Sequence, residues 1–244
     1  MTHSDFVHLH VHTQYSLLDG ACLLERLLRK AKEHRMPACA ITDHGNMFGA
    51  IEFYDLAMKS GIKPIIGSEV YIAPDSRFEK SSHGIREAAF HLILLARNEA
   101  GYKNLMKLIS AGFLEGFYYR PRIDKEILAK HKDGLICLSS CLHGEIPHLI
   151  STNQPEQARK TADEYKSIFG KDNFYLEIQD NLIPEQDKVN RELIKLSKDL
   201  GLGLVATNDV HYLEMENARA HEVLLCIQTQ TTMDDPNRLR FQTD

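Results

Sequence analysis

Short, almost continuously apolar runs alternate with longer amphipathic stretches along most of the 244 residues, and this alternation strongly constrains the fold. The apolar runs predict seven strands, at residues 6–13, 38–43, 64–72, 91–96, 135–140, 174–178 and 204–209. The amphipathic stretches predict helices at 22–35, 100–113, 156–169, 185–200 and 218–227. Strands that are apolar on both faces are typical of parallel sheets covered by helices, so we predict an α/β fold. An irregular seven-stranded barrel and a doubly wound open sheet both fit this pattern.

Composition narrows the class of protein. The chain is 43% hydrophobic and 26% charged, which is typical of a soluble globular protein. Its net charge of −5 argues against a broad basic surface for duplex DNA, but allows a pocket for one strand end. The five cysteines form no CxxC pair, so we expect free thiols and a cytoplasmic location. No apolar run approaches the roughly 18–20 residues of a membrane span, so no membrane association is expected.

Three of the thirteen histidines alternate with apolar residues in the first predicted strand. His8, His10 and His12 share one face, because strand side chains alternate with a period of two. Functional sites of parallel α/β folds lie at the carboxyl ends of strands, which favours His10 and His12 as metal ligands and places His8 deeper. A strand with buried, hydrogen-bonded histidines is the alternative explanation.

The later predicted strands also carry polar side chains at or near one end. Glu69 interrupts an Ile/Val-rich run, and a buried carboxylate is costly unless it is paired or bound to a metal. Asp209 and His211 share a face, whereas His91 stands at the start of its strand, where the register is less clear. The full set of these strand-end residues is Asp43, His44, Glu69, His91, Cys141, Asp209 and His211. Each has an ordinary structural explanation, but together they predict a metal site.

Imidazole, carboxylate and thiol donors suit Zn²⁺, Mn²⁺ or Fe²⁺ better than Mg²⁺ or Ca²⁺. The number of donors indicates more than one ion, and clustered divalent ions are well suited to phosphate ester hydrolysis. Asp43 is also a candidate for orienting a ligand histidine.

Several of these motifs together resemble the polymerase-and-histidinol-phosphatase (PHP) domain family. The shared stretches are HLHVHT at 8–13, ITDHGN at 41–46, GSE at 67–69, the histidine before LILLA at 91–95, SSC at 139–141 and ATNDVH at 206–211. Further stretches at 15–20, 101–105, 116–122 and 234–238 are similar to the PHP domains of bacterial replicative DNA polymerases in particular. The resemblance covers about residues 6–244.

The resemblance implies a distorted seven-stranded, TIM-like (β/α)7 barrel with three divalent ions at the carboxyl ends of its strands. Zn²⁺ and Mn²⁺ are the expected ions, and Fe²⁺ is a further candidate. The family's nine ligands fall on His10, His12, Asp19, His44, Glu69, His91, Cys141, Asp209 and His211. By analogy, the first ion takes His10, His12, Glu69 and Asp209, the second takes Asp19, His44 and His211, and the third takes His91 and Cys141, with Glu69 bridging. Asp19 enters through the resemblance alone.

Domains of this family that keep all nine ligands can act as 3′–5′ exonucleases that proofread the polymerase, so the resemblance implies a DNA 3′ end as substrate. Two alternatives stay open: a phosphomonoesterase of the histidinol-phosphate type, and a metal-stabilised scaffold without activity. A barrel of the amidohydrolase type also begins with HxH, but we find no candidate bridging lysine. The polymerase reaction itself is not expected, because we find no further carboxylate cluster after Asp209.

Residues 1–244 are expected to form a single PHP domain, with an incomplete tail at 229–244 and a polymerase body following in a longer chain. Other replisome subunits are further candidate partners. Arg120 and Arg122 lie in an aromatic loop with Tyr118, where they are candidates for stacking on a base and binding a phosphate. His83 is a weaker candidate for a substrate contact, and His143 for supporting a ligand.

Overall fold

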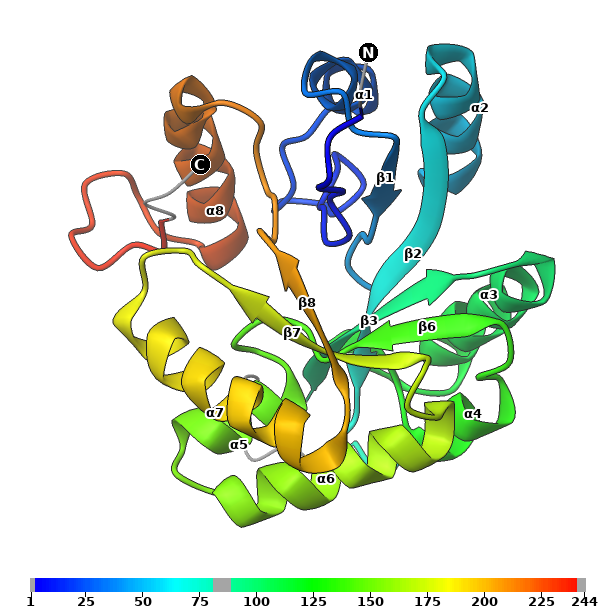
Figure 1. Ribbon diagram of the computed structural model, residues 1–244. Coiled ribbons are helices and arrows are strands. Elements are labelled where there is room, and N and C mark those ends of the chain that lie inside the picture. Colours follow the sequence, from blue (N-terminus) through cyan, green and yellow to red (C-terminus); the bar gives the residue numbers. More distant parts are fainter. Residues whose placement is uncertain (1–2, 81–88, 241–244) are drawn as a thin grey trace.

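The strands form one curled, mixed sheet, and the helices lie on its outside (Figure 1). The computed structural model describes residues 3–80 and 89–240. Its strands are β1 (Ala38–Ile41), β2 (Lys63–Ile72), β3 (Phe90–Ala96), β4 (Phe117–Tyr118), β5 (Arg120–Ile123), β6 (Leu135–Leu138), β7 (Phe174–Gln179) and β8 (Gly203–Thr207). They are ordered β4-β5-β2-β3-β6-β7-β8, and β1 pairs with β2. This confirms the α/β class, with a curled rather than a flat sheet.

The helices fall close to the predicted positions, with three additions. They are α1 (Leu24–Glu33), α2 (Ala50–Ser60), α3 (Glu99–Leu114), α4 (Lys125–Lys130), α5 (Glu145–Ser151), α6 (Pro155–Phe169), α7 (Pro184–Leu200) and α8 (Ala218–Thr229). A short 3₁₀ turn, Met215–Asn217, precedes α8. The amphipathic stretches had not indicated α2, α4 or α5. No helix in the described ranges is long and apolar enough to cross a membrane.

The prediction of a parallel sheet is wrong at β3 and at the short antiparallel pair β4·β5. β3 is antiparallel to both of its neighbours, with Glu69 opposite Ile93 and Ile93 opposite Leu138. The pairs β1·β2, β2·β5, β6·β7 and β7·β8 are parallel, as expected. An apolar run predicts a strand but not its direction. The start of β3 therefore lies at the same end of the sheet as the carboxyl ends of its neighbours β2 and β6.

The first predicted strand, 6–13, is not a regular strand in the structure. It forms only isolated bridges, from Val11 to Val210 and from Thr13 to Cys22. The backbone amide of His12 donates to Val210 at 2.8 Å, and that of Thr42 donates to Val11 at 2.9 Å. The segment therefore lies between the end of β1 and the residues that follow β8. A regular seven-stranded barrel is not confirmed.

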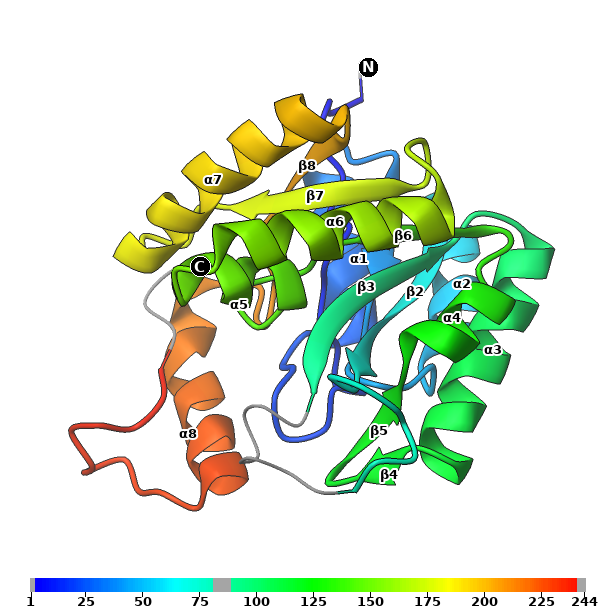
Figure 2. The same cartoon turned by 90° about the horizontal axis from the view of Figure 1, so that it is seen from below.

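An apolar layer fills the inside of the curled sheet beneath the polar cluster. Ala40, Ile93, Leu95 and Leu138 are buried there and pack against the partly buried Leu9. A larger core lies between the sheet and helices α3 to α7. Figure 2 shows these helices around the sheet, seen from below. Full burial of one Leu or Ile side chain contributes about 1.5–3 kcal/mol. These layers hold the strands rigidly, so the polar side chains at the strand ends are placed by a packed framework.

Candidate metal centre

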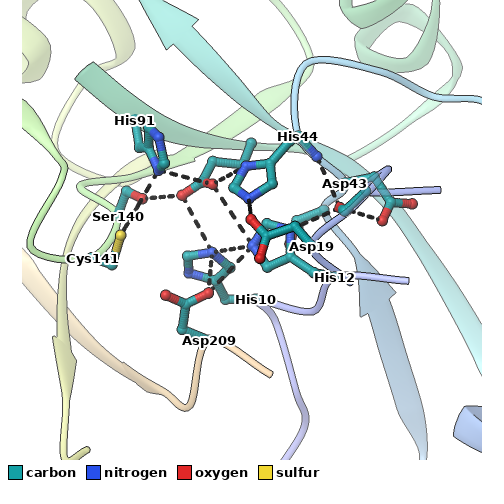
Figure 3. A network of polar contacts seen from close by, with 12 residues as sticks. His10, His12, Asp19, Asp43, His44, His91, Ser140, Cys141 and Asp209 are labelled. Atoms are coloured by element: carbon teal, nitrogen blue, oxygen red, sulfur yellow. Dashed lines mark hydrogen bonds and ion pairs between the residues drawn. The ribbon is translucent and has the colours of Figure 1, made fainter. Parts of the chain in front are cut away.

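The nine side chains named by the resemblance lie in one cluster at one end of the curled sheet (Figure 3). They come from the segment before α1, from the ends of β1, β6 and β8 or the residues just after them, from within β2 and from the start of β3. The antiparallel direction of β3 explains why His91, at the start of its strand, joins this cluster.

Glu69 is at the centre of the cluster and is almost completely buried. Its Oε1 atom lies 3.3 Å from Nε2 of His10 and accepts a hydrogen bond from Ser140 Oγ at 2.5 Å. Its Oε2 atom lies 2.7 Å from Nδ1 of His44 and 3.0 Å from Nδ1 of His91. One carboxylate thus touches three imidazoles, which is the arrangement that a bridging ligand requires.

Asp209 and Asp19 are close to the remaining imidazoles. Oδ1 of Asp209 lies 3.1 Å from Nε2 of His10 and 3.3 Å from Nε2 of His12. Oδ2 of Asp19 lies 3.0 Å from Nε2 of His44, and Oδ1 of Asp19 lies 3.7 Å from Nε2 of His211. Asp19 lies in a turn after the first segment, outside every strand, so strand periodicity had no means of finding it.

The charges in the cluster depend strongly on one another. Burial acts to raise the pKa of Glu69, but His91, His44 and His10 outweigh it and hold that pKa well below its usual value. Burial, together with His44 and His211, lowers the pKa of His12 to about 3. Burial also acts to lower the pKa of His10, but Asp209 and Glu177 outweigh it and raise that pKa well above the ordinary value. Glu69 is therefore ionised and His12 is neutral, as metal ligands need, whereas His10 keeps a proton in the metal-free protein that a bound ion would displace.

The donor set fits divalent cations. Oε2 of Glu69 and Oδ1 of Asp209 are buried and find no donor with hydrogen-bond geometry among the described residues. Nε2 of His10 and Nε2 of His12 lie only 3.1 Å apart. Several groups of three side chains place their ligand atoms within 4.8 Å of one another, and these groups are His12/His44/His211, His10/His12/Glu69, His44/Glu69/His91 and His91/Cys141/His143. Imidazole, carboxylate and thiol atoms crowded in this way match the ligand preferences of Zn²⁺ and similar ions.

A second layer of buried groups orients the histidines. Ser16 Oγ lies 3.0 Å from His12 Nδ1 and donates to Asp43 Oδ1 at 2.8 Å. Asp43 thus contacts His12 through Ser16, and its role in orienting that histidine stays a prediction. His10 Nδ1 lies 2.7 Å from Glu177 Oε1, within β7.

Sequence reasoning missed Ser16 and Glu177. The signal for Glu177 was present, because it is a carboxylate inside an apolar strand, as Glu69 is. His221, on α8, is buried with its Nε2 atom 3.9 Å from Asp19 Oδ1.

The three candidate substrate contacts have different positions. Arg120 lines a cavity of about 310 Å³ that opens above Asp19, Glu69 and Asp209. Arg122 instead is buried, and its guanidinium donates to the carbonyl oxygens of Gly116 and Glu79. Its guanidinium carbon lies 5.0 Å from the centre of the Tyr118 ring. Neither Arg122 nor Tyr118 lines the cavity, so the structure leaves Arg120 alone as a candidate; His83 lies outside the described residues.

Comparison with known proteins places this fold and cluster in a family. Residues 8–181 match the PHP domain family, and the chain therefore belongs to it. Over 244 residues it is 52% identical to the DNA polymerase III subunit alpha of Treponema pallidum (strain Nichols), covering 100% of this chain and 21% of that protein. Over 242 residues it is 54% identical to the corresponding subunit of Thermus aquaticus, covering 98% and 20%. The chain thus spans about a fifth of the length of these relatives and matches their N-terminal part.

A solved structure from Bifidobacterium adolescentis ATCC 15703, assigned to the metal-dependent phosphoesterases, has a similar fold. The TM-score is 0.52 with 13% sequence identity, and the match covers 89% of this chain and 96% of that one. At this identity the likeness shows the fold alone.

Proposed function

We propose that this chain is a metal-dependent phosphodiesterase, and specifically the 3′–5′ DNA exonuclease domain that proofreads for a DNA polymerase III alpha subunit. The observation that carries the proposal is the intact cluster of nine donors beneath an open cavity. Identity of about 50% to polymerase alpha subunits supports DNA as the substrate.

The proposed ligands hold three divalent ions, Zn²⁺, Mn²⁺ or both, with Fe²⁺ as a further candidate. His10, His12, Glu69 and Asp209 hold the first ion. This fits the distances of 3.1–3.7 Å between the two imidazoles and from each imidazole to the two carboxylates. Asp19, His44 and His211 hold the second, and His91 and Cys141 hold the third with Glu69 shared. The central carboxylate of Glu69, within reach of imidazoles from all three groups, supports this partition.

When bound, such ions polarise a phosphate ester, lower the pKa of water and neutralise the charge of a leaving oxygen. The chain itself supplies the orientation. Ser140 holds Glu69, Ser16 holds His12, and Glu177 holds His10, so the donors stay fixed as substrate enters. Arg120, at the edge of the cavity, is placed to bind a phosphate of the incoming strand.

The lining of the cavity favours the end of a single strand, rather than duplex DNA, as the substrate. Its lining combines the acidic cluster with Arg120 on one side and the neutral amides of Asn181 and Gln186. The net charge of −5 offers no general attraction for a duplex, so binding depends on this local contact.

We further propose that residues 1–244 act as one PHP domain in the cytoplasm, attached to a polymerase body in the same chain. Other replisome subunits are candidate partners. The support is the match to about a fifth of each polymerase alpha relative.

The test is a 5′-labelled primer with a mismatched 3′ end, incubated with the purified chain and Mn²⁺ or Zn²⁺. We expect stepwise shortening from the 3′ end that is abolished by a chelator and by His12→Ala. Hydrolysis of a phosphate monoester without shortening would favour the phosphatase. Bound metal with neither activity would favour the scaffold.

A further inference from the structure

A tenth potential metal donor, His143, lies beside the His91 and Cys141 pair. Cys141 Sγ is 3.9 Å from His91 Nδ1 and also 3.9 Å from His143 Nδ1. The ligand atoms of these three residues lie within 4.8 Å of one another. Glu69 Oε2 lies 3.0 Å from the same His91 nitrogen. Four side chains therefore surround one small volume at the edge of the cluster.

The backbone after β6 fixes His143 in this place. Ser140 adopts φ 66°, which turns the chain sharply at the end of the strand. The amide of Gly144 donates to the carbonyl of Cys141 at 2.8 Å, and the amide of His91 donates to the carbonyl of His143 at 3.0 Å. A side chain at Gly144 would put its Cβ 2.1 Å from the Ser139 carbonyl oxygen, so the tight turn requires glycine there. The turn is thus attached directly to the strand that carries His91.

The spacing of these donors matches a tetrahedral zinc site. With a Zn–S bond of about 2.3 Å and Zn–N bonds of about 2.0–2.1 Å, ligand sulfur and nitrogen atoms in a tetrahedron are roughly 3.6 Å apart. Both observed separations are 3.9 Å, about 0.3 Å above this value, and the exposed His143 side chain can close its own distance with a small adjustment.

We propose that His143 is the fourth protein ligand of the ion held by Glu69, His91 and Cys141, so that this ion has four protein donors and its site selects Zn²⁺. The inference rests on the proposed metal centre and deepens it. Sites with four protein ligands are usually structural, whereas catalytic sites keep a position open. Substrate binding then falls to the other two ions. Thiolate and imidazole ligands favour Zn²⁺ over Mn²⁺.

Co²⁺ provides a probe for this one site, because a cobalt–thiolate charge-transfer band reports only an ion bound to cysteine. Cys22, Cys39, Cys137 and Cys226 are buried and belong to none of the metal-donor groups in the described part of the chain. Metal-free protein would be titrated with Co²⁺ against a competing chelator, following this band. The variants are His143→Ala, His143→Asp, Cys141→Ser and, as a matched control, His131→Ala at the end of α4.

We expect His143→Ala to keep the band, to weaken its cobalt affinity at least tenfold, and to lower the ligand-field absorption that marks four-coordination. His143→Asp keeps a donor atom and should recover part of the affinity, and His131→Ala should match the wild type. Equal affinity and equal spectra for wild type and His143→Ala would overturn the inference. So would slower hydrolysis with unchanged cobalt affinity, which would make His143 a proton donor.

The same titration separates this inference from the proposed function. Absence of any thiolate band in the wild type, or a band that survives Cys141→Ser, would remove the metal assignment at Cys141 itself. A band that is lost in Cys141→Ser but is the same in wild type and His143→Ala would be consistent with the metal centre. It would exclude only His143 as the fourth ligand.

Discussion

Replacing Glu177 with glutamine isolates the contribution of a residue that touches no ion in the proposed centre. Its Oε1 atom accepts from His10 Nδ1 at 2.7 Å and from Gln179 Nε2 at 2.9 Å, and it also accepts from Thr207 Oγ1. Glutamine keeps the shape but loses the charge. Its amide nitrogen would take the place of Glu177 Oε2, which is buried without a hydrogen-bond partner among the described residues.

The expected effect is a loss of metal affinity. Carboxylates that orient a ligand histidine change metal affinity by about 10–100-fold. That corresponds to roughly 1.4–2.8 kcal/mol, at about 1.4 kcal/mol per tenfold. At saturating metal, the stabilisation of the folded state by bound metal should fall by the same amount.

The assay compares the free energy of unfolding with and without Zn²⁺ for wild type, Glu177→Gln and Glu145→Gln. Glu145 is a suitable control because its carboxylate accepts from Lys125 Nζ and Tyr165 Oη, each at 2.8 Å, rather than from a proposed ligand. Glu145→Gln should lower stability equally in both conditions. A Glu177→Gln variant that keeps the full increment from Zn²⁺ would refute the reasoning.

Three further predictions concern other parts of the molecule. Arg120→Gln should raise KM for a DNA 3′ end about 10–100-fold with little change in kcat, because a charged hydrogen bond contributes about 1.5–3 kcal/mol. The measurement is steady-state kinetics, and a reduced kcat with a constant KM would contradict this prediction. Burial acts to raise the pKa of Asp124, but the Arg77 amide, the Ile127 amide and the Arg77 guanidinium outweigh it and lower that pKa. The stabilisation from ionised Asp124 is therefore present above the unfolded pKa of about 3.9 and is lost as pH falls through the lower folded value, and Asp124→Asn should flatten this acid limb in urea titrations. Gly101→Ala should destabilise the fold by about 1–3 kcal/mol, because the new Cβ would lie 1.8 Å from the Gly134 carbonyl oxygen, and unchanged urea unfolding would contradict it.

Much of the cluster could be predicted, because the direction in which a side chain points in an extended segment depends on its neighbours in the sequence. His10 and His12 share a face although their segment forms only isolated bridges, and Glu69 interrupts an apolar run; both patterns identify side chains that point inward at one end of a sheet. These inferences need no knowledge of the whole fold, and the structure places all three side chains together.

The remaining features depend on contacts between distant segments. The direction of β3 is set by its pairing with β2 and β6, so the place of His91 could not be read from its own strand. Arg122 and Arg120 are two residues apart and looked equivalent, yet only the fold shows that one is buried and the other lines the cavity. His143 depends on a tight turn whose path is set by Ser140 and by a backbone bond to His91.

The central claim is that side chains gathered from the ends of separate strands hold divalent ions beneath the cavity. Anomalous diffraction from crystals loaded with Zn²⁺ or Mn²⁺ tests it most directly. We predict three peaks within the cluster, with Glu69 next to all of them and, for Zn²⁺, donor atoms about 2.0–2.3 Å away. Protein that binds these metals in solution but shows anomalous peaks only outside the cluster would contradict the account.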